Sequence, residues 1–192
     1  MPEVVKPVFP ALVTLETERL MLRALTLEDA DDVFAYARDP EVVRYLPWES
    51  HQSVEEAREF ITRTLQAHEA GAKADWGMAL KATGRVVGTC GFCAWAGSSG
   101  RAELGYCLAR ELWGRGLVTE ASERVVRFGF EDCMLNRIEA MCDVNNIGSA
   151  RVMEKCGMTF EGVLRQRLLM HDSYRDMKMY AILREDWLRL QG

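Results

Sequence analysis

Several features are scarce in this 192-residue sequence, and each absence narrows the range of functions. No apolar run is long enough to cross a bilayer, and the opening MPEVVKPVFP has acidic and proline residues where a secretory signal needs an apolar stretch. Basic charge is not in excess, because 24 lysines and arginines stand against 29 aspartates and glutamates, a formal net charge of −5. We therefore expect a cytoplasmic protein whose partners include neither membrane nor nucleic acid.

The six cysteines have no pattern typical of a disulfide framework or of a zinc site. They are scattered through apolar stretches, as reduced and buried thiols usually are. Cys90 and Cys93 have the Cys-x-x-Cys spacing, but no second pair of this kind and no histidine pair completes a metal site. We expect neither a disulfide nor a bound metal, and interpret these two cysteines as part of a strand.

What is present is typical of a globular protein. Hydrophobic residues make up 48% of the chain and charged residues 28%, and the length allows a sizeable core without cross-links. No internal repeat, low-complexity tract or linker divides the sequence. We predict a single domain over residues 1–192, with residues 1–13 as a loose N-terminal lead-in.

Hydrophobic spacing and turn residues predict the order of helices and strands. Strands are expected at 15–25, 76–81, 85–95, 102–108, 137–143 and on both sides of a loop at 171–175. Helices are expected at 29–38, 54–70, from 117 onwards, 149–156 and 185–190, with a short helical piece after Pro40. A run of consecutive strands therefore precedes a β-α-β segment, which predicts an α+β fold with a mixed sheet and helices on its faces.

The most informative segment is the predicted strand 102–108, followed by a glycine-containing turn and a helix from Leu117. A helix N-terminus offers unpaired N–H groups, and Gly114 and Gly116 would let an anion approach the backbone closely. The segment therefore indicates a phosphate site, although the same glycines are also typical of a plain tight turn. A Walker A lysine is missing, and Thr119 stands where a dinucleotide fingerprint needs its third glycine.

Seven stretches in this order resemble the GNAT N-acetyltransferase superfamily, especially its ribosomal-protein-acetylating branch of the RimJ and RimL type. They are TERLMLR at 17–23, AELGYCL at 102–108, WGRGLVTEA at 113–121, NRIEA at 136–140, NIGS at 146–149, MEKCG at 153–157 and YRD at 174–176. The resemblance covers nearly the whole chain. It implies a mostly antiparallel, partly splayed central sheet and acetyl-CoA as cosubstrate.

The resemblance also implies where acetyl-CoA binds. Its pyrophosphate would lie on the backbone of Trp113, Gly114, Arg115, Gly116, Leu117 and Val118, with the Thr119 hydroxyl adding a contact. The pantetheine arm would pair like an extra strand with the backbone of Cys107 and Leu108. Asn146 would contact the arm, and Lys155 the adenosine phosphate, unless it is an ordinary solvated lysine at a helix end. Glu111 departs from the family, which has Gln or Arg at this position of the loop.

For catalysis, the resemblance points to Glu103 as the general base, acting through water, and to Ser149 as the hydrogen-bond donor to the leaving sulfur. The alternatives are a strand glutamate that faces solvent and a serine that caps a helix. Met153 stands where relatives that use a tyrosine as the general acid have that tyrosine. A backbone N–H near Leu108 would stabilise the developing oxyanion.

We expect direct transfer, because none of the three histidines has a triad context beside a cysteine.

The acceptor is expected between the segment at 45–48 and the loop at 171–174, with Tyr45, Trp48 and Tyr174 as candidate contacts. Trp48 fits a core position equally well. An acidic protein suits a cationic amine, such as the N-terminus of a ribosomal or other protein, a polyamine or an aminoglycoside.

Relatives often form dimers, so we expect a homodimer. The alternatives are a non-catalytic acyl-CoA sensor with the same fold and, less favoured by the sequence, a dinucleotide-binding oxidoreductase.

Overall fold

The computed structural model describes residues 7–191, so the first six residues of the expected lead-in and Gly192 lie outside it. Residues 7–14 form neither helix nor strand, and they are held to the body by hydrogen bonds such as that from Trp76 Nε1 to the Val13 carbonyl, 2.9 Å. Among the described residues, no helix combines the length and apolar character that a membrane span requires.

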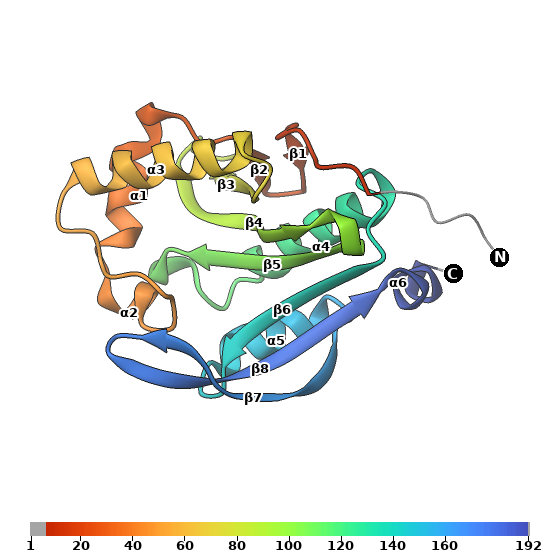
Figure 1. The fold of residues 1–192 in the computed structure, drawn as a ribbon. Coiled ribbons are helices and arrows are strands. Elements are labelled where there is room, and N and C mark those ends of the chain that lie inside the picture. Colours follow the sequence, from red (N-terminus) through yellow and green to blue (C-terminus); the bar gives the residue numbers. More distant parts are fainter. Residues whose placement is uncertain (1–6, 192) are drawn as a thin grey trace.

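One eight-stranded sheet organises the structure (Figure 1). In spatial order its strands are β1 (Leu15–Glu16), β2 (Leu20–Arg23), β3 (Ala74–Leu80), β4 (Val86–Ala96), β5 (Arg101–Leu108), β6 (Arg137–Asp143), β8 (Ser173–Leu183) and β7 (Thr159–Met170). Every neighbouring pair is antiparallel except β5 and β6. The mixed sheet and the meander from β3 to β5 confirm the predicted fold class.

The parallel pair β5–β6 is short. Only Arg101–Glu103 pairs with Arg137–Glu139, whereas β5 continues to Leu108 against β4 alone. The two strands then diverge (Figure 1), so the splayed sheet that the resemblance implied is present. The second half of β5 therefore has backbone groups on one side that no strand occupies.

The prediction of one strand over 15–25 is wrong, because the segment folds as two short strands, β1 and β2. A tight turn separates them: Thr17 N–H donates to the Leu20 carbonyl at 3.0 Å, and Leu20 N–H donates back to the Thr17 hydroxyl at 3.0 Å. Leu15, Leu20 and Leu22 are all buried by this hairpin. The local polar bonds of Thr17 override the alternation of the sequence.

Helices cover both faces of the sheet. They are α1 (Ala30–Ala37), α2 (Pro40–Val43), α3 (Val54–Glu69), α4 (Leu117–Glu131), α5 (Ile147–Lys155) and α6 (Arg184–Gln191). Thr26 and Asp29 form a capping box at the short 3-10 helix η1 (Leu27–Asp29) that leads into α1. Ser53 caps α3, because its hydroxyl accepts from Glu56 N–H at 3.3 Å. Figure 1 shows α1 and α3 on one side of the sheet and α4 and α5 on the other.

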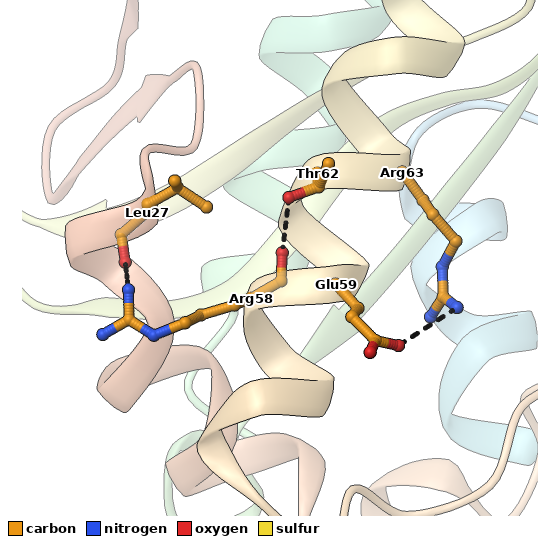
Figure 2. A pocket seen from close by; sticks show the side chains of 5 residues that line it. All are labelled: Leu27, Arg58, Glu59, Thr62 and Arg63. Atoms are coloured by element: carbon orange, nitrogen blue, oxygen red, sulfur yellow. Dashed lines mark hydrogen bonds and ion pairs between the residues drawn. The ribbon is translucent and has the colours of Figure 1, made fainter.

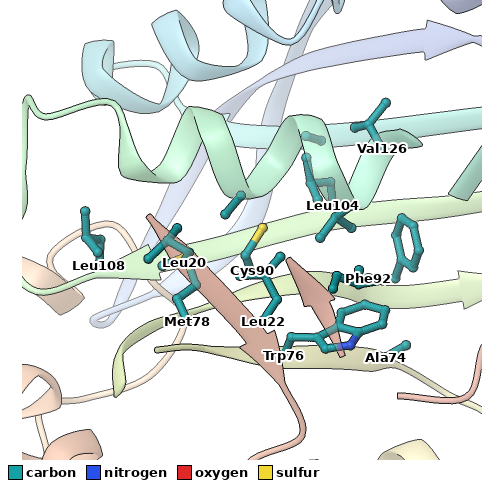
Figure 3. Close-up of a cluster of buried hydrophobic side chains, with 14 of the residues drawn as sticks. Leu20, Leu22, Ala74, Trp76, Met78, Cys90, Phe92, Leu104, Leu108 and Val126 are labelled. Atoms are coloured by element: carbon teal, nitrogen blue, oxygen red, sulfur yellow. The ribbon is translucent and has the colours of Figure 1, made fainter. Parts of the chain in front are cut away.

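The core between α4 and the sheet fixes the helix that follows the glycine turn (Figure 3). Trp76, Cys90, Phe92 and Leu104 of three neighbouring strands are buried there beneath Val126. Burying apolar area at about 25 cal/mol per Å² makes such a cluster the main stabiliser of the helix position. The N-terminus of α4 is therefore held firmly beside the C-terminal end of β5.

Candidate active site

The turn between β5 and α4 presents a row of free backbone donors. Gly114 and Gly116 have positive φ values of 74° and 78°, and α4 begins directly after them. Within residues 7–191, the N–H groups of residues 114–119 donate to no backbone acceptor. Residues 113–116 are exposed, so the first donors of this row are accessible to an anion.

Trp113 does not share this property, which corrects part of the predicted cradle. Its backbone N–H donates to the Arg110 carbonyl at 3.1 Å, and its indole Nε1 donates to the Leu108 carbonyl at 2.8 Å. The tryptophan therefore contributes no free amide, and one lone pair of the Leu108 carbonyl is already used. Its role is to brace the turn against the end of β5.

Ser149 and Tyr106 meet where β5 and β6 separate. The hydroxyl groups lie 2.8 Å apart, and Tyr106 Oη also lies 3.1 Å from the Ser149 carbonyl. The helix cap of α5 is Asn146, whose side-chain oxygen accepts from Ser149 N–H at 3.1 Å. The capping alternative for Ser149 is therefore wrong, and its hydroxyl is available for another partner.

Glu103 lies on β5 next to a second carboxylate. Its side chain is half-buried. In the parallel register it faces Glu139, which is buried and paired with Arg101 and with Arg137 at 2.9 Å. Burial and the negative charge of Glu139 raise the pKa of Glu103 above its ordinary value. A carboxylate with a raised pKa is a better proton acceptor for a general base.

The cysteines are free thiols in an environment that disfavours the thiolate. Burial raises the pKa of Cys107 and of Cys142, the two that lie nearest to the splayed strands. The Cys107 thiol lies 3.5 Å from the Thr89 hydroxyl. Among the described side chains, no histidine is hydrogen-bonded to a cysteine, which is consistent with direct transfer.

His171 joins the two regions expected to bind the acceptor. Its Nδ1 lies 2.8 Å from Glu49, and its Nε2 lies 3.4 Å from the Val43 carbonyl. The β7–β8 turn is thereby connected to the segment after α2, as Figure 1 shows. Tyr45 follows α2, and Tyr174, 67% exposed, starts β8.

Trp48 is better explained by packing than by substrate contact. It is half-buried, and its ring centroid lies 5.4 Å from that of His51 and 6.2 Å from that of Phe60.

Lys155 is exposed in the last turn of α5 and forms no ion pair within the described part of the chain. This position fits both a contact with the adenosine phosphate and an ordinary solvated lysine at a helix end.

The surface hollow in Figure 2 is separate from these residues. It has a volume of about 330 Å³ and is lined by Leu27, Arg58, Glu59, Thr62 and Arg63, on η1 and α3. Its polar groups are satisfied locally, for example by the bond from Arg58 to the Leu27 carbonyl at 3.2 Å. None of the site residues predicted from the sequence borders it.

Sequence reasoning missed three features of the site: the hydroxyl of Tyr106, the carboxylate of Glu139, and the contact between Glu120 and Arg19. Each lies in one of the stretches that carry the family resemblance. Their partners, however, are 36 to 101 positions away and depend on strand register. The only indication in the sequence was that these residues belong to the stretches that resemble the family.

Comparisons with known proteins agree with this geometry. Residues 19–159 match the family model described as acetyltransferase (GNAT) domain. The N-acetyltransferase p20 of Bacillus licheniformis is 36% identical over 91% of this chain and 98% of its own length. The ribosomal-protein-serine acetyltransferase of Escherichia coli is 28% identical over 68% of this chain and 72% of its own. A crystal structure of an acetyltransferase (GNAT family) from Bacillus anthracis superposes with a TM-score of 0.81 at 28% identity, covering 90% and 99%.

Proposed function

The chain belongs to the acetyltransferase (GNAT) family and is an N-acetyltransferase, and we propose that it moves the acetyl group of acetyl-CoA directly to a primary amine. The observation that carries this proposal is the row of free N–H groups at 114–119, placed beside the open half of β5. Family membership also sets aside the dinucleotide-binding oxidoreductase. We further propose that the chain acts as one domain, in the cytoplasm and as a homodimer.

The free donors suit the pyrophosphate of acetyl-CoA. The backbone of residues 114–118 and the hydroxyl of Thr119 would contact phosphate oxygens, helped by the positive end of the α4 dipole. The open edge at Cys107 and Leu108 would pair with the pantetheine arm. Asn146 uses its side-chain oxygen in the cap of α5, so its amide N–H₂ would be the group that reaches the arm. Lys155 would contact the adenosine phosphate.

Glu103 would remove a proton from the acceptor ammonium through a water molecule. Its raised pKa supports this role, because a more basic carboxylate accepts a proton more readily. When bound, acetyl-CoA supplies an activated thioester. The chain's own contribution is then to deliver a neutral amine to it and to place an N–H near Leu108 toward the carbonyl oxygen.

Ser149 would assist the departing sulfur. Either hydroxyl of the pair Tyr106–Ser149 could be the donor; in the arrangement where Tyr106 donates to Ser149 Oγ, the serine proton would be free to point toward the sulfur. Met153, at the family's tyrosine position, is buried and has no acidic proton to offer. The pair Tyr106–Ser149 would take over that task.

The acceptor would enter between the α2 segment and the β7–β8 turn, contacting Tyr45 and Tyr174. A relative acts on a ribosomal protein, which favours a protein N-terminus as the acceptor. The acidic net charge is equally suited to a polyamine or an aminoglycoside. A non-catalytic acyl-CoA sensor with the same fold is the alternative proposal, which binding of acetyl-CoA without turnover of any amine would support.

Thermal unfolding with acetyl-CoA, NADH and ATP tests the cosubstrate first. A ligand at 100 times its dissociation constant stabilises the protein by roughly 2.7 kcal/mol, which shifts the melting temperature measurably. We expect a shift with acetyl-CoA alone, followed by thiol release when amines are added. Binding without thiol release for any peptide N-terminus, polyamine or aminoglycoside would favour the sensor, and no shift would end the acetyl-CoA proposal.

A further inference from the structure

The turn between β1 and β2 touches the phosphate-binding loop, although about a hundred residues separate them in sequence. We propose that Thr17, Arg19 and Glu120 form a latch that positions this loop for the pyrophosphate of acetyl-CoA, an inference that rests on the proposed function. None of the three is assigned to contact the cosubstrate. They are positioning residues, which act through the backbone of the loop.

The contacts converge on one carboxylate. Glu120, in the first turn of α4, accepts from Arg19 N–H at 2.8 Å, from Arg19 Nε at 2.7 Å and from the Thr17 hydroxyl. Arg19 Nη1 then donates to the Arg115 carbonyl at 2.9 Å, inside the loop itself. One guanidinium therefore holds both the loop and the helix that follows it.

Holding the Arg115 carbonyl also orients a phosphate donor. This carbonyl and the N–H of Gly116 belong to the same planar trans peptide, so they point in opposite directions. With the carbonyl turned toward Arg19, the Gly116 N–H is directed away from the latch, and it is among the free donors. Gly116, at a φ of 78°, has no Cβ to restrict rotation of this peptide, so the bond from Arg19 supplies that restriction.

The charges of the latch are balanced. The pKa of Glu120 is lowered: its partial burial acts to raise it, but the hydrogen bonds from Thr17 and Arg19 outweigh that effect. Glu120 is therefore anionic near neutral pH, and Arg19 neutralises its charge beside the anion site. The hairpin itself is anchored, because Lys81 N–H of the neighbouring segment donates to the Arg19 carbonyl at 3.0 Å.

Kinetics with two thioester substrates distinguish an effect on loop position from a general loss of stability. We would measure kcat and KM of Glu120→Gln and Thr17→Val with acetyl-CoA and with acetyl-pantetheine, which lacks the pyrophosphate. The expected result is a KM for acetyl-CoA raised about tenfold at unchanged kcat, with unchanged kinetics on acetyl-pantetheine. Thr17→Ser keeps the hydroxyl and should restore the wild-type KM. Thr17→Val is the fallback if Glu120→Gln does not fold.

The matched control is Glu16→Gln. It breaks the ion pair of Glu16 with Lys81, 2.8 Å, in the same hairpin but away from the loop, and should leave both substrates unaffected. Equal losses on both thioesters, or no change in either, would overturn the latch. A wild-type enzyme that does not prefer acetyl-CoA to acetyl-pantetheine would instead remove the phosphate cradle of the proposed function, and the latch with it.

Discussion

The two halves of β5 differ in what surrounds their backbone. The first half, Arg101–Glu103, is paired on both sides and lies beside a cluster of ion pairs that includes Glu139, Arg137 and Glu161. The second half, up to Leu108, is paired on one side only and continues into the free donors of the glycine turn. In the first half, the backbone groups are used in strand pairing on both sides. In the second half, the groups on one side are free to bind a ligand.

We propose Glu103, in the half of β5 that is paired on both sides, as the general base, and Glu103→Gln tests this role. The amide cannot accept a proton, so kcat should fall by about 10²- to 10³-fold, while KM for acetyl-CoA stays unchanged. Steady-state kinetics with a saturating amine measure both constants. A variant within twofold of wild-type kcat would remove Glu103 from the mechanism.

The pH profiles of the wild-type enzyme and of Glu103→Gln test the same role of Glu103. The pKa of Glu103 is raised, and only its ionised form can act as a base, so kcat/KM should be retained above that pKa and fall as the pH drops through it. In Glu103→Gln this acidic limb should be absent from the residual activity. An identical limb in both enzymes would assign it to another group.

The ion pairs beside the first half of β5 should matter for stability. Arg137→Met leaves the buried carboxylate of Glu139 with Arg101 alone and should lower the free energy of unfolding by about 2 to 3 kcal/mol. Urea unfolding measures this loss. Arg189→Met removes the exposed ion pairs with Glu185 and Asp186 and is the control, expected to change stability by less than about 0.5 kcal/mol.

The open half should be sensitive to the backbone of the turn. Gly116→Ala places a side chain at a φ of 78°, which costs roughly 1 kcal/mol and moves the peptide that carries a free donor. We expect KM for acetyl-CoA to rise about fivefold to tenfold with kcat little changed. Gly71→Ala, at a φ of 70° in the loop after α3, is a control for strain alone.

The smallest expected effect concerns Tyr106, which lies where β5 and β6 separate. Tyr106→Phe removes the hydroxyl that lies 2.8 Å from Ser149, so kcat should fall about threefold to fivefold, and less than in Ser149→Ala. Single-turnover measurements of thiol release would report this step. A Tyr106→Phe loss larger than that of Ser149→Ala would give the tyrosine a role independent of the serine.

Much of the fold was predictable because it depends on neighbouring residues. The strand at 137–143 was predicted with its observed bounds, and the position of α4 after Gly116 was predicted from the two glycines. Gly157, with a φ of 78°, comes directly after the C-cap of α5, a position where glycine is common. The same local logic failed at 15–25, where the hydrogen bonds of Thr17 close a turn that hydrophobic alternation does not reveal.

The sequence by itself determined the order of elements, the glycine turn and the set of motifs that identify the family, since periodicity and φ preference are properties of consecutive residues. Tertiary structure alone decided which carboxylate faces Glu103, that Asn146 rather than Ser149 caps α5, and that Arg19 reaches the Arg115 carbonyl. These contacts depend on strand register and helix placement. Both result from packing the whole core, which no single stretch of sequence specifies.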